Sequence, residues 1–157
     1  MRAMAGIVAL VAALLAGGYS MGEAAPPAPG DISEIQRPTS PNTCLAGPPG
    51  FKLTPDLQTR HFNLAPQQLL AAMQGVMRAQ PRVTALADDP KRLRADYVVR
   101  SRVFGFPDIV LVQALAAGDG QSELAVYSYS LKGHYDFGVN RGRVRALLSA
   151  LDGALAQ

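Results

Sequence analysis

Two segments of the chain place hydrophobic residues at the spacing of one helix face. The first runs from Pro66, where the missing backbone N–H costs nothing because a helix start leaves it unpaired, to a stop at Pro81. The second begins near Asn140, a favourable N-cap residue. Both patterns predict amphipathic helices that pack through one face. The apolar positions of the first are Leu69, Leu70, Met73, Val76 and Met77, and those of the second are Val144, Leu147, Leu148, Leu151 and Leu155.

Between the helices the hydrophobic period changes to two, which is typical of strands. Strands are expected over 83–87, 97–104, 108–116 and 123–131, and a short one over 59–64 ahead of the first helix. The turns between them are short, which favours antiparallel neighbours. The sequence therefore predicts an α+β fold, a two-layer sandwich in which two helices pack on one face of an antiparallel sheet of four to five strands.

The start of the chain has a different pattern. Residues 3–22 carry no charge, with Arg2 before them and Glu23 after. Residues 1–24 fit a cleavable signal peptide, and they also reach the length of an uncleaved membrane anchor. Either interpretation places the protein outside the cytoplasm, in the periplasm or another extracytoplasmic space, exported or held on the inner membrane by one N-terminal segment.

Residues 25–50 hold seven of the twelve prolines and predict an extended linker without helix or central strand. The single folded domain is expected over 51–157. Cys44, the one cysteine, has no partner within the chain, and packing in a loop is favoured over a reactive thiol or an intermolecular bridge.

Composition narrows the function classes. The 157 residues are 48% hydrophobic with a net charge of +3, which describes one globular domain plus an apolar segment and excludes a wholly disordered chain. A single cysteine excludes a disulfide scaffold. The modest charge and the compartment argue against a nucleic-acid partner. No spacing of histidines, cysteines and acids suggests a metal, and no cofactor motif appears.

Three stretches carry a family resemblance. They are Asp-Phe-Gly-Val-Asn-Arg over 136–141, Pro-Asn-Thr-Cys over 41–44 and Arg-Ser-Arg-Val-Phe-Gly-Phe-Pro-Asp over 100–108. Taken in their order along the chain, they resemble the signature of DUF1499, a bacterial and plastid family, over about residues 37–151. The resemblance implies no established activity; an N-terminal membrane segment is frequent in the family, which favours the anchor.

The chain departs from the family pattern at three positions. Leu131 stands where arginine is common, Tyr135 where serine is common, and Ile109 in place of a second acid after Asp108. Any role that rested on that arginine or that second acid is therefore not transferred to this chain.

The start of the second helix presents an electrostatic question. Arg141, Arg143 and Arg145 lie where the helix dipole disfavours cations by about 0.3–1 kcal/mol each. A nearby acid offsets this cost if Arg141 is a buried partner of Asp136 or Asp108. A bound anion offsets it if the arginines and the helix N–H groups form a site. The candidate anion-binding residues are Asp136, Asn140, Arg141, Arg143, Lys132, His134, Arg100 and Asp108.

The leading functional hypothesis is a noncatalytic cell-envelope module that binds a protein partner or a small anionic ligand near the strand-to-helix loop. A hydrolase-type enzyme acting on an envelope or lipid-derived substrate is the alternative, with His134, Asp136 and a serine as working groups. A third hypothesis is an accessory subunit recognised through an apolar patch on the sheet face away from the helices.

Overall fold

The structure is a computed structural model that describes Pro27 and residues 30–157. The predicted signal or anchor over 1–24 lies outside these residues. Within them, no helix combines the length and the apolar character needed to cross a membrane. The elements in chain order are η1 (Ile32–Glu34), β1 (Thr43–Gly47), β2 (Leu57–Gln58), α1 (Pro66–Ala79), β3 (Val83–Asp89), β4 (Arg94–Arg100), β5 (Pro107–Ala116), β6 (Ser122–Ser130) and α2 (Val139–Leu155).

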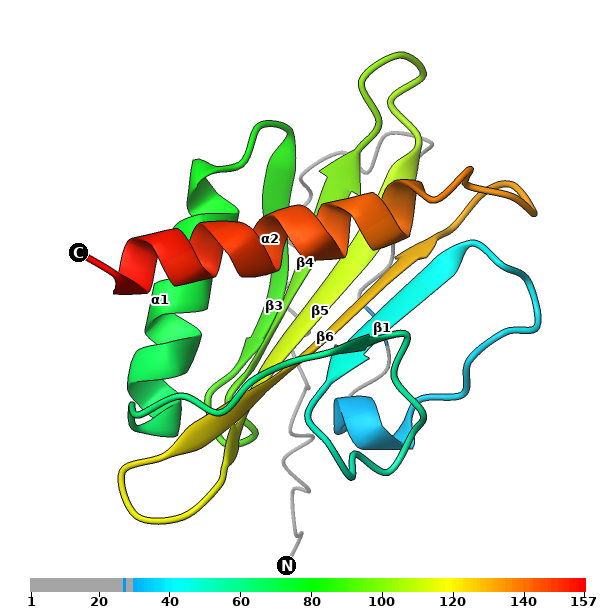
Figure 1. The fold of residues 1–157 in the computed structure, drawn as a ribbon. Coiled ribbons are helices and arrows are strands. Elements are labelled where there is room, and N and C mark those ends of the chain that lie inside the picture. The colour runs from blue at the N-terminus through cyan, green and yellow to red at the C-terminus, as the bar shows by residue number, and fades with distance from the viewer. Residues whose placement is uncertain (1–26, 28–29) are drawn as a thin grey trace, which may run out of the picture.

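The α+β class with two helices is confirmed, and the details of the sheet differ from expectation. The described strands form one six-stranded sheet in the order β2-β1-β6-β5-β4-β3 (Figure 1). The strands from β3 to β6 are antiparallel neighbours, as their short turns predict. The pair β1–β2 is parallel, so the sheet is mixed. The strand expected over 59–64 is reduced to an isolated bridge between Phe62 and Ser122, after the short β2.

The prediction that 25–50 is a linker without a central strand is wrong. β1 lies inside the sheet, hydrogen-bonded to β2 on one side and β6 on the other. Prolines 41 and 48 flank this strand and do not interrupt it, so its N–H groups remain free to pair. The folded domain therefore begins well before Phe51. Cys44 lies in this strand and not in a loop, and it is fully buried.

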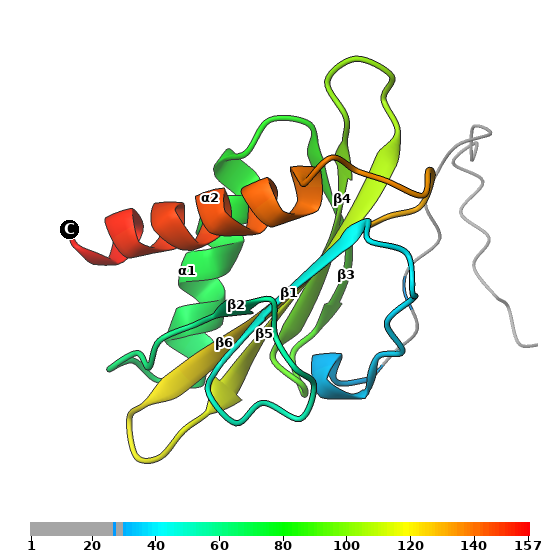
Figure 2. The ribbon, with the colours of Figure 1, turned by 45° about the vertical axis from the view of Figure 1, so that its right-hand side comes forward.

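Both faces of the sheet are covered. α1 and α2 pack on one face, over a core that includes Met73, Val110 and Leu147. η1 and the segment after β1 cover part of the other, where Ile32 and Phe51 pack against Ile109. Figure 2 shows the helices and η1 on opposite sides of the sheet. The expected apolar patch on the face away from the helices is thus a second buried cluster.

Candidate functional site

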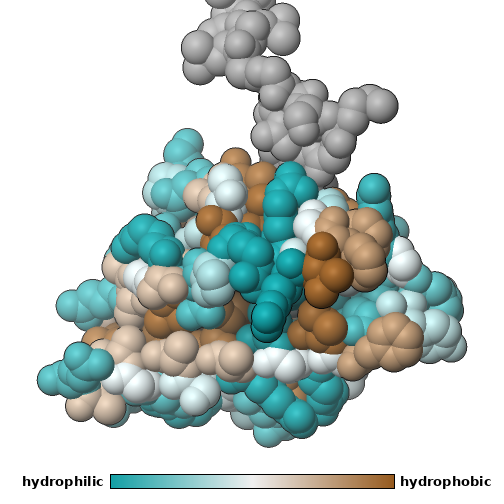
Figure 3. All heavy atoms as spheres, turned by 90° about the horizontal axis from the view of Figure 1, so that it is seen from above, coloured by the Kyte–Doolittle hydropathy of each residue, from teal (hydrophilic) through white to brown (hydrophobic). Residues whose placement is uncertain are grey.

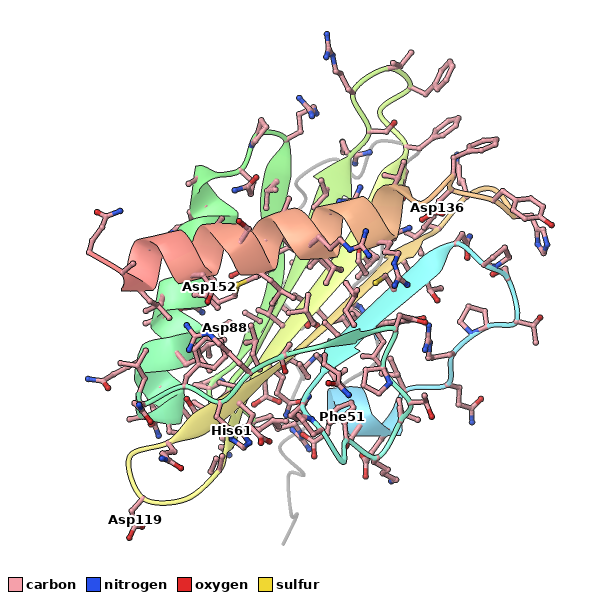
Figure 4. The ribbon with its side chains drawn as sticks, in the orientation of Figure 1. Phe51, His61, Asp88, Asp119, Asp136 and Asp152 are labelled. Atoms are coloured by element: carbon pink, nitrogen blue, oxygen red, sulfur yellow. The ribbon has the colours of Figure 1, made fainter. Side chains whose placement is uncertain are left out.

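The three family stretches, far apart in sequence, meet at one end of the sheet. Register places Asp108 at the start of β5 opposite Ser130 at the end of β6, and Thr43 of β1 opposite Tyr129. α2 begins beside this end, where Figure 4 labels Asp136. The site is therefore built by the ends of β1, β4, β5 and β6 and the first turns of α2.

Asn140 is the centre of a polar network at this end. Its side chain is fully buried. Its Oδ1 accepts from Ser128 Oγ at 2.6 Å, and its Nδ2 donates to the backbone oxygen of Asn42 at 2.9 Å and to Ser130 Oγ at 2.9 Å. The sequence suggested Asn140 as the N-cap of this helix. Its place inside the first turn instead locks α2 to β6 and to the residue that precedes β1.

Asp136 supplies the cap that the sequence analysis assigned to Asn140. Its carboxylate accepts from the backbone N–H groups of Gly138 at 2.9 Å and Asn140 at 2.8 Å. Partial burial opposes ionisation of Asp136, but these hydrogen bonds outweigh it and hold its pKa below the ordinary value. Gly138 is the N-cap residue itself, with a left-handed backbone at φ 79° that glycine adopts without strain.

Arg143, not Arg141, is the buried ion-pair partner. Its Nη2 lies 2.6 Å from Asp108 Oδ2, and the two side chains are only 14% and 8% exposed. Its Nη1 also donates to Asn140 Oδ1 at 2.7 Å and to Ser128 Oγ at 3.0 Å. Arg141 is exposed and reaches the backbone oxygen of Asp56 at 3.3 Å. The acid that offsets a cation in this helix turn is therefore Asp108, and it acts on Arg143.

The remaining candidates lie outside the network. Lys132 is exposed, with its Nζ 5.7 Å from the centre of the Phe106 ring. His134 is exposed and packs edge-on against Tyr135. Arg100 donates from Nη1 to the backbone oxygen of Gly105 at 3.1 Å. The candidates thus divide into a polar scaffold and a group outside it; the scaffold holds Asp108, Asp136, Asn140 and Arg143, and the other group holds Arg100, Lys132, His134 and Arg141.

A pocket of about 420 Å³ opens beside this scaffold, a size typical of small-molecule sites. It lies between the end of α1, the first turns of α2 and the β3–β4 edge of the sheet. Its walls are largely apolar, and its charged lining consists of four arginines without an acid. The apolar residues are Met77, Pro81, Val83, Val99, Val139, Ala146 and Leu147, and the arginines are Arg82, Arg100, Arg102 and Arg143.

Sequence reasoning missed Arg82 as a site residue. Its Nε donates to the backbone oxygen of Arg100 at 3.1 Å, so the two arginines are held side by side across β3 and β4. The signal was available in the alternation of the two strands, since pairing Val83 with Val99 brings the preceding Arg82 next to the following Arg100. Arg102 is exposed and, among the described residues, has no hydrogen-bond or ion-pair partner.

The working groups of the hydrolase hypothesis are not joined to one another within residues 30–157. His134 packs edge-on against Tyr135, and the Asp136 carboxylate accepts from the N–H groups of Gly138 and Asn140 and not from a histidine. His61 lies 3.1 Å from Glu123 near the start of β6, far from Asp136 in Figure 4. Ser128 Oγ is buried and bonded to Asn140 and Arg143. The part of the chain that the structure describes also contains no group of three or more metal-ligating side chains.

Comparisons with known proteins identify the family but no activity. No curated protein matches the chain in sequence. Among solved structures, the chain is similar to the crystal structure of Ara h 8.0201, with 14% identity, a TM-score of 0.45, and coverage of 63% of this chain and 99% of that one. The family described as "Protein of unknown function (DUF1499)" matches residues 26–151, which include every described strand and most of α2. The chain belongs to the DUF1499 family.

Proposed function

We propose that this domain is a noncatalytic binding module of the cell envelope, and that its ligand is a small amphipathic anion. The ligand combines an apolar chain or ring with a carboxylate, phosphate or sulfate group. It lies in the pocket between α1, α2, β3 and β4, with its apolar part against Leu147 and Val99 and its charged group among the arginines of the rim.

The observation that carries the proposal is the division of the pocket lining into apolar walls and a cationic rim. Apolar walls favour hydrocarbon because burial removes it from water. Arginine side chains recognise oxyanions through paired N–H donors. Arg143 is already paired with Asp108, but the pocket lining holds three further arginines and no acid, which favours an anion over a cation or a neutral molecule.

The buried network supports a binding role over catalysis. Ser128, Asn140, Asp108 and Arg143 satisfy one another, so their hydrogen-bonding groups are used to hold α2 in place. Such a network gives the pocket a rigid wall. The groups that remain available to a ligand are the exposed arginines of the rim, above all Arg102.

Titration calorimetry with decanoate and with decanol tests the proposal. We expect decanoate to bind and decanol to bind much more weakly, because only decanoate carries the charge. Arg102→Glu should weaken decanoate binding by about tenfold or more, the loss of one hydrogen bond to a charged group. Arg145→Glu is the matched control, since Arg145 is exposed on α2 outside the pocket lining.

A second pair of variants tests the location. Ala146 is exposed on the pocket rim, so Ala146→Trp should obstruct the opening, whereas Ser149→Trp one turn further along α2 should not. Equal affinity for decanoate in both tryptophan variants would exclude this pocket. Equal affinity for decanoate and decanol would exclude recognition of the anion.

A further inference from the structure

The exposed large hydrophobic side chains of the described chain are confined to two connections at one end of the molecule. Three lie between β4 and β5 and the others between β6 and the start of α2. Seen from above, Figure 3 shows hydrophobic and strongly hydrophilic residues side by side at this end. The first group is Val103, Phe104 and Phe106, and the second is Leu131, Tyr135, Phe137 and Val139.

The β4–β5 connection is an ordered loop that presents apolar residues at its tip. Ser101 fixes both ends of it, through its N–H to the Phe106 oxygen at 2.9 Å and by accepting from the Phe106 N–H at its Oγ. Phe104 and Phe106 stack with ring centres 5.4 Å apart. Val103 and Phe104 remain 78% and 74% exposed, and the loop projects beyond the sheet in Figure 1.

The β6–α2 connection exposes a phenylalanine to solvent in an unfavourable backbone conformation. Phe137 is 98% exposed and has φ 53°, in the left-handed region that side chains other than glycine rarely adopt. The Asp136 carboxylate fixes this geometry by accepting from the N–H groups on the far side of Phe137. Exposure of this ring is unfavourable in water, which points to a bound state in which it is covered.

Cations surround these apolar tips. Arg102 and Lys132 are exposed beside them, and Lys132 lies against the Phe106 ring, which links the two connections. The acids at this end are already engaged. Asp108 is buried against Arg143, and Asp136 accepts from the start of α2. The surface that faces outward is therefore apolar and positive.

We propose that this end of the molecule docks on the surface of a lipid bilayer rich in anionic headgroups. Aromatic and aliphatic loop tips enter the boundary between headgroups and acyl chains, while arginine and lysine side chains contact the phosphates. Two separate projecting tips with cations beside them fit a deformable, negatively charged layer, which apolar side chains can enter at two points while its phosphates meet the cations. A bilayer is also the neighbour that the uncharged segment over 3–22 predicts.

The absence of tryptophan from the sequence permits a direct test in the full chain. Phe104→Trp and Phe137→Trp place an indole at each tip, and Asp119→Trp places one in the exposed β5–β6 turn at the far end, labelled in Figure 4. Each variant is reconstituted with vesicles of phosphatidylcholine and phosphatidylglycerol that carry bromine on their acyl chains. Because all variants share the N-terminal segment, the comparison reports which end of the domain meets the lipid.

We expect indole emission at positions 104 and 137 to shift to shorter wavelength and to be quenched by the brominated lipid, and emission at 119 to change little. Quenching should decrease in vesicles of phosphatidylcholine alone. It should also decrease when Arg102→Gln and Lys132→Gln are added, since each cation near an anionic surface contributes about fivefold to the attraction. All the substituted positions lie outside both core clusters, so we expect the variants to keep the fold.

Two results would overturn the proposal. Equal quenching at all three positions would mean that the domain has no preferred orientation on the bilayer. A blue shift at 104 and 137 that occurs without vesicles and grows with protein concentration would identify a protein surface, a second copy of this chain, as the partner. Arg102 also lines the arginine-rimmed pocket, whereas Phe104, Phe137 and Lys132 do not, so quenching at the two tips and its response to Lys132→Gln alone test the proposal independently of what occupies that pocket.

Discussion

Arg143 places a positive charge in a helix turn where the macrodipole disfavours one, and Asp108 supplies the compensation from a neighbouring strand. That Arg143 is the arginine of the buried ion pair could have been predicted from its position relative to the buried face of α2. Val144 and Leu147 are buried, and the positions four residues before them are Asn140 and Arg143. Extending the apolar stripe back by one turn therefore assigns these two residues to the inner face, and leaves Arg141 outside.

The ion pair gives the prediction at this scale. Arg143→Ala should lower the free energy of unfolding by about 3–5 kcal/mol, because Asp108 remains buried without its partner. Arg141→Ala, the matched control on the exposed side, should change it by less than about 0.5 kcal/mol. Urea unfolding of both variants provides the measurement. Similar losses in the two would show that the pair at Arg143 contributes no specific stability.

Cys44 shows a second residue whose environment decides its chemistry. Burial raises the pKa of its thiol to about 11, and nearby Asp56 adds to the effect. The thiol is therefore protonated near neutral pH and enclosed between strands. The prediction that Cys44 is packed agrees with this burial, although the residue lies in a strand and not in a loop.

At the scale of the elements, the stability of the start of α2 depends on one ionisable group. The carboxylate of Asp136 caps the helix, and its depressed pKa means that the folded state favours the ionised form. The stabilisation is present above the unfolded pKa of about 4 and is lost as the pH falls through the lower folded pKa.

Asp136→Ala should therefore cost about 1–2 kcal/mol of unfolding free energy at pH 7, as loss of a cap does. The difference between the original chain and the variant should shrink below about pH 4, because protonation removes the same charged interactions in the original chain. Unfolding curves measured across this range provide the test. A difference that stays constant down to the lowest accessible pH would show that the charge of Asp136 does not matter.

Elements with a one-sided environment could be predicted from the sequence, and so could β5, a long aliphatic run that is buried on both faces, whereas the short β1 could not. α1 begins at Pro66 as predicted; its hydrophobic pattern is clear because one face of the helix is buried and the other is exposed to solvent. β1 has no alternation to detect, since Cys44, Leu45 and Ala46 are all buried, covered from both faces of the sheet. The same holds for the site. The sequence pattern identified the charged residues of the site, but which of them form contacts depends on strand pairing across the sheet, as for Asp108 and Arg143.

At the scale of the whole molecule, β1 joins the proline-rich region to the rest of the domain. It carries fully buried residues of both core clusters and separates β2 from β6. A domain that starts at Phe51 would lack an interior strand and would expose the edge of β6.

A fragment spanning 51–157 should therefore fail to unfold cooperatively in urea, whereas a fragment spanning 30–157 should show one transition. Circular dichroism at increasing urea concentration distinguishes the two. A cooperative transition of equal midpoint in the shorter fragment would mean that β1 is dispensable, contrary to its central position.

The position of β1 also has a consequence for the order in which the chain folds. Asn42, next to this strand, bonds to Asn140, 98 residues later in the chain. During synthesis the strand leaves the ribosome long before β6 and α2 exist to receive it, and contacts so distant in sequence close slowly. The completed sheet must therefore form after nearly the whole domain has emerged, and until then the proline-flanked strand lacks its long-range partner β6.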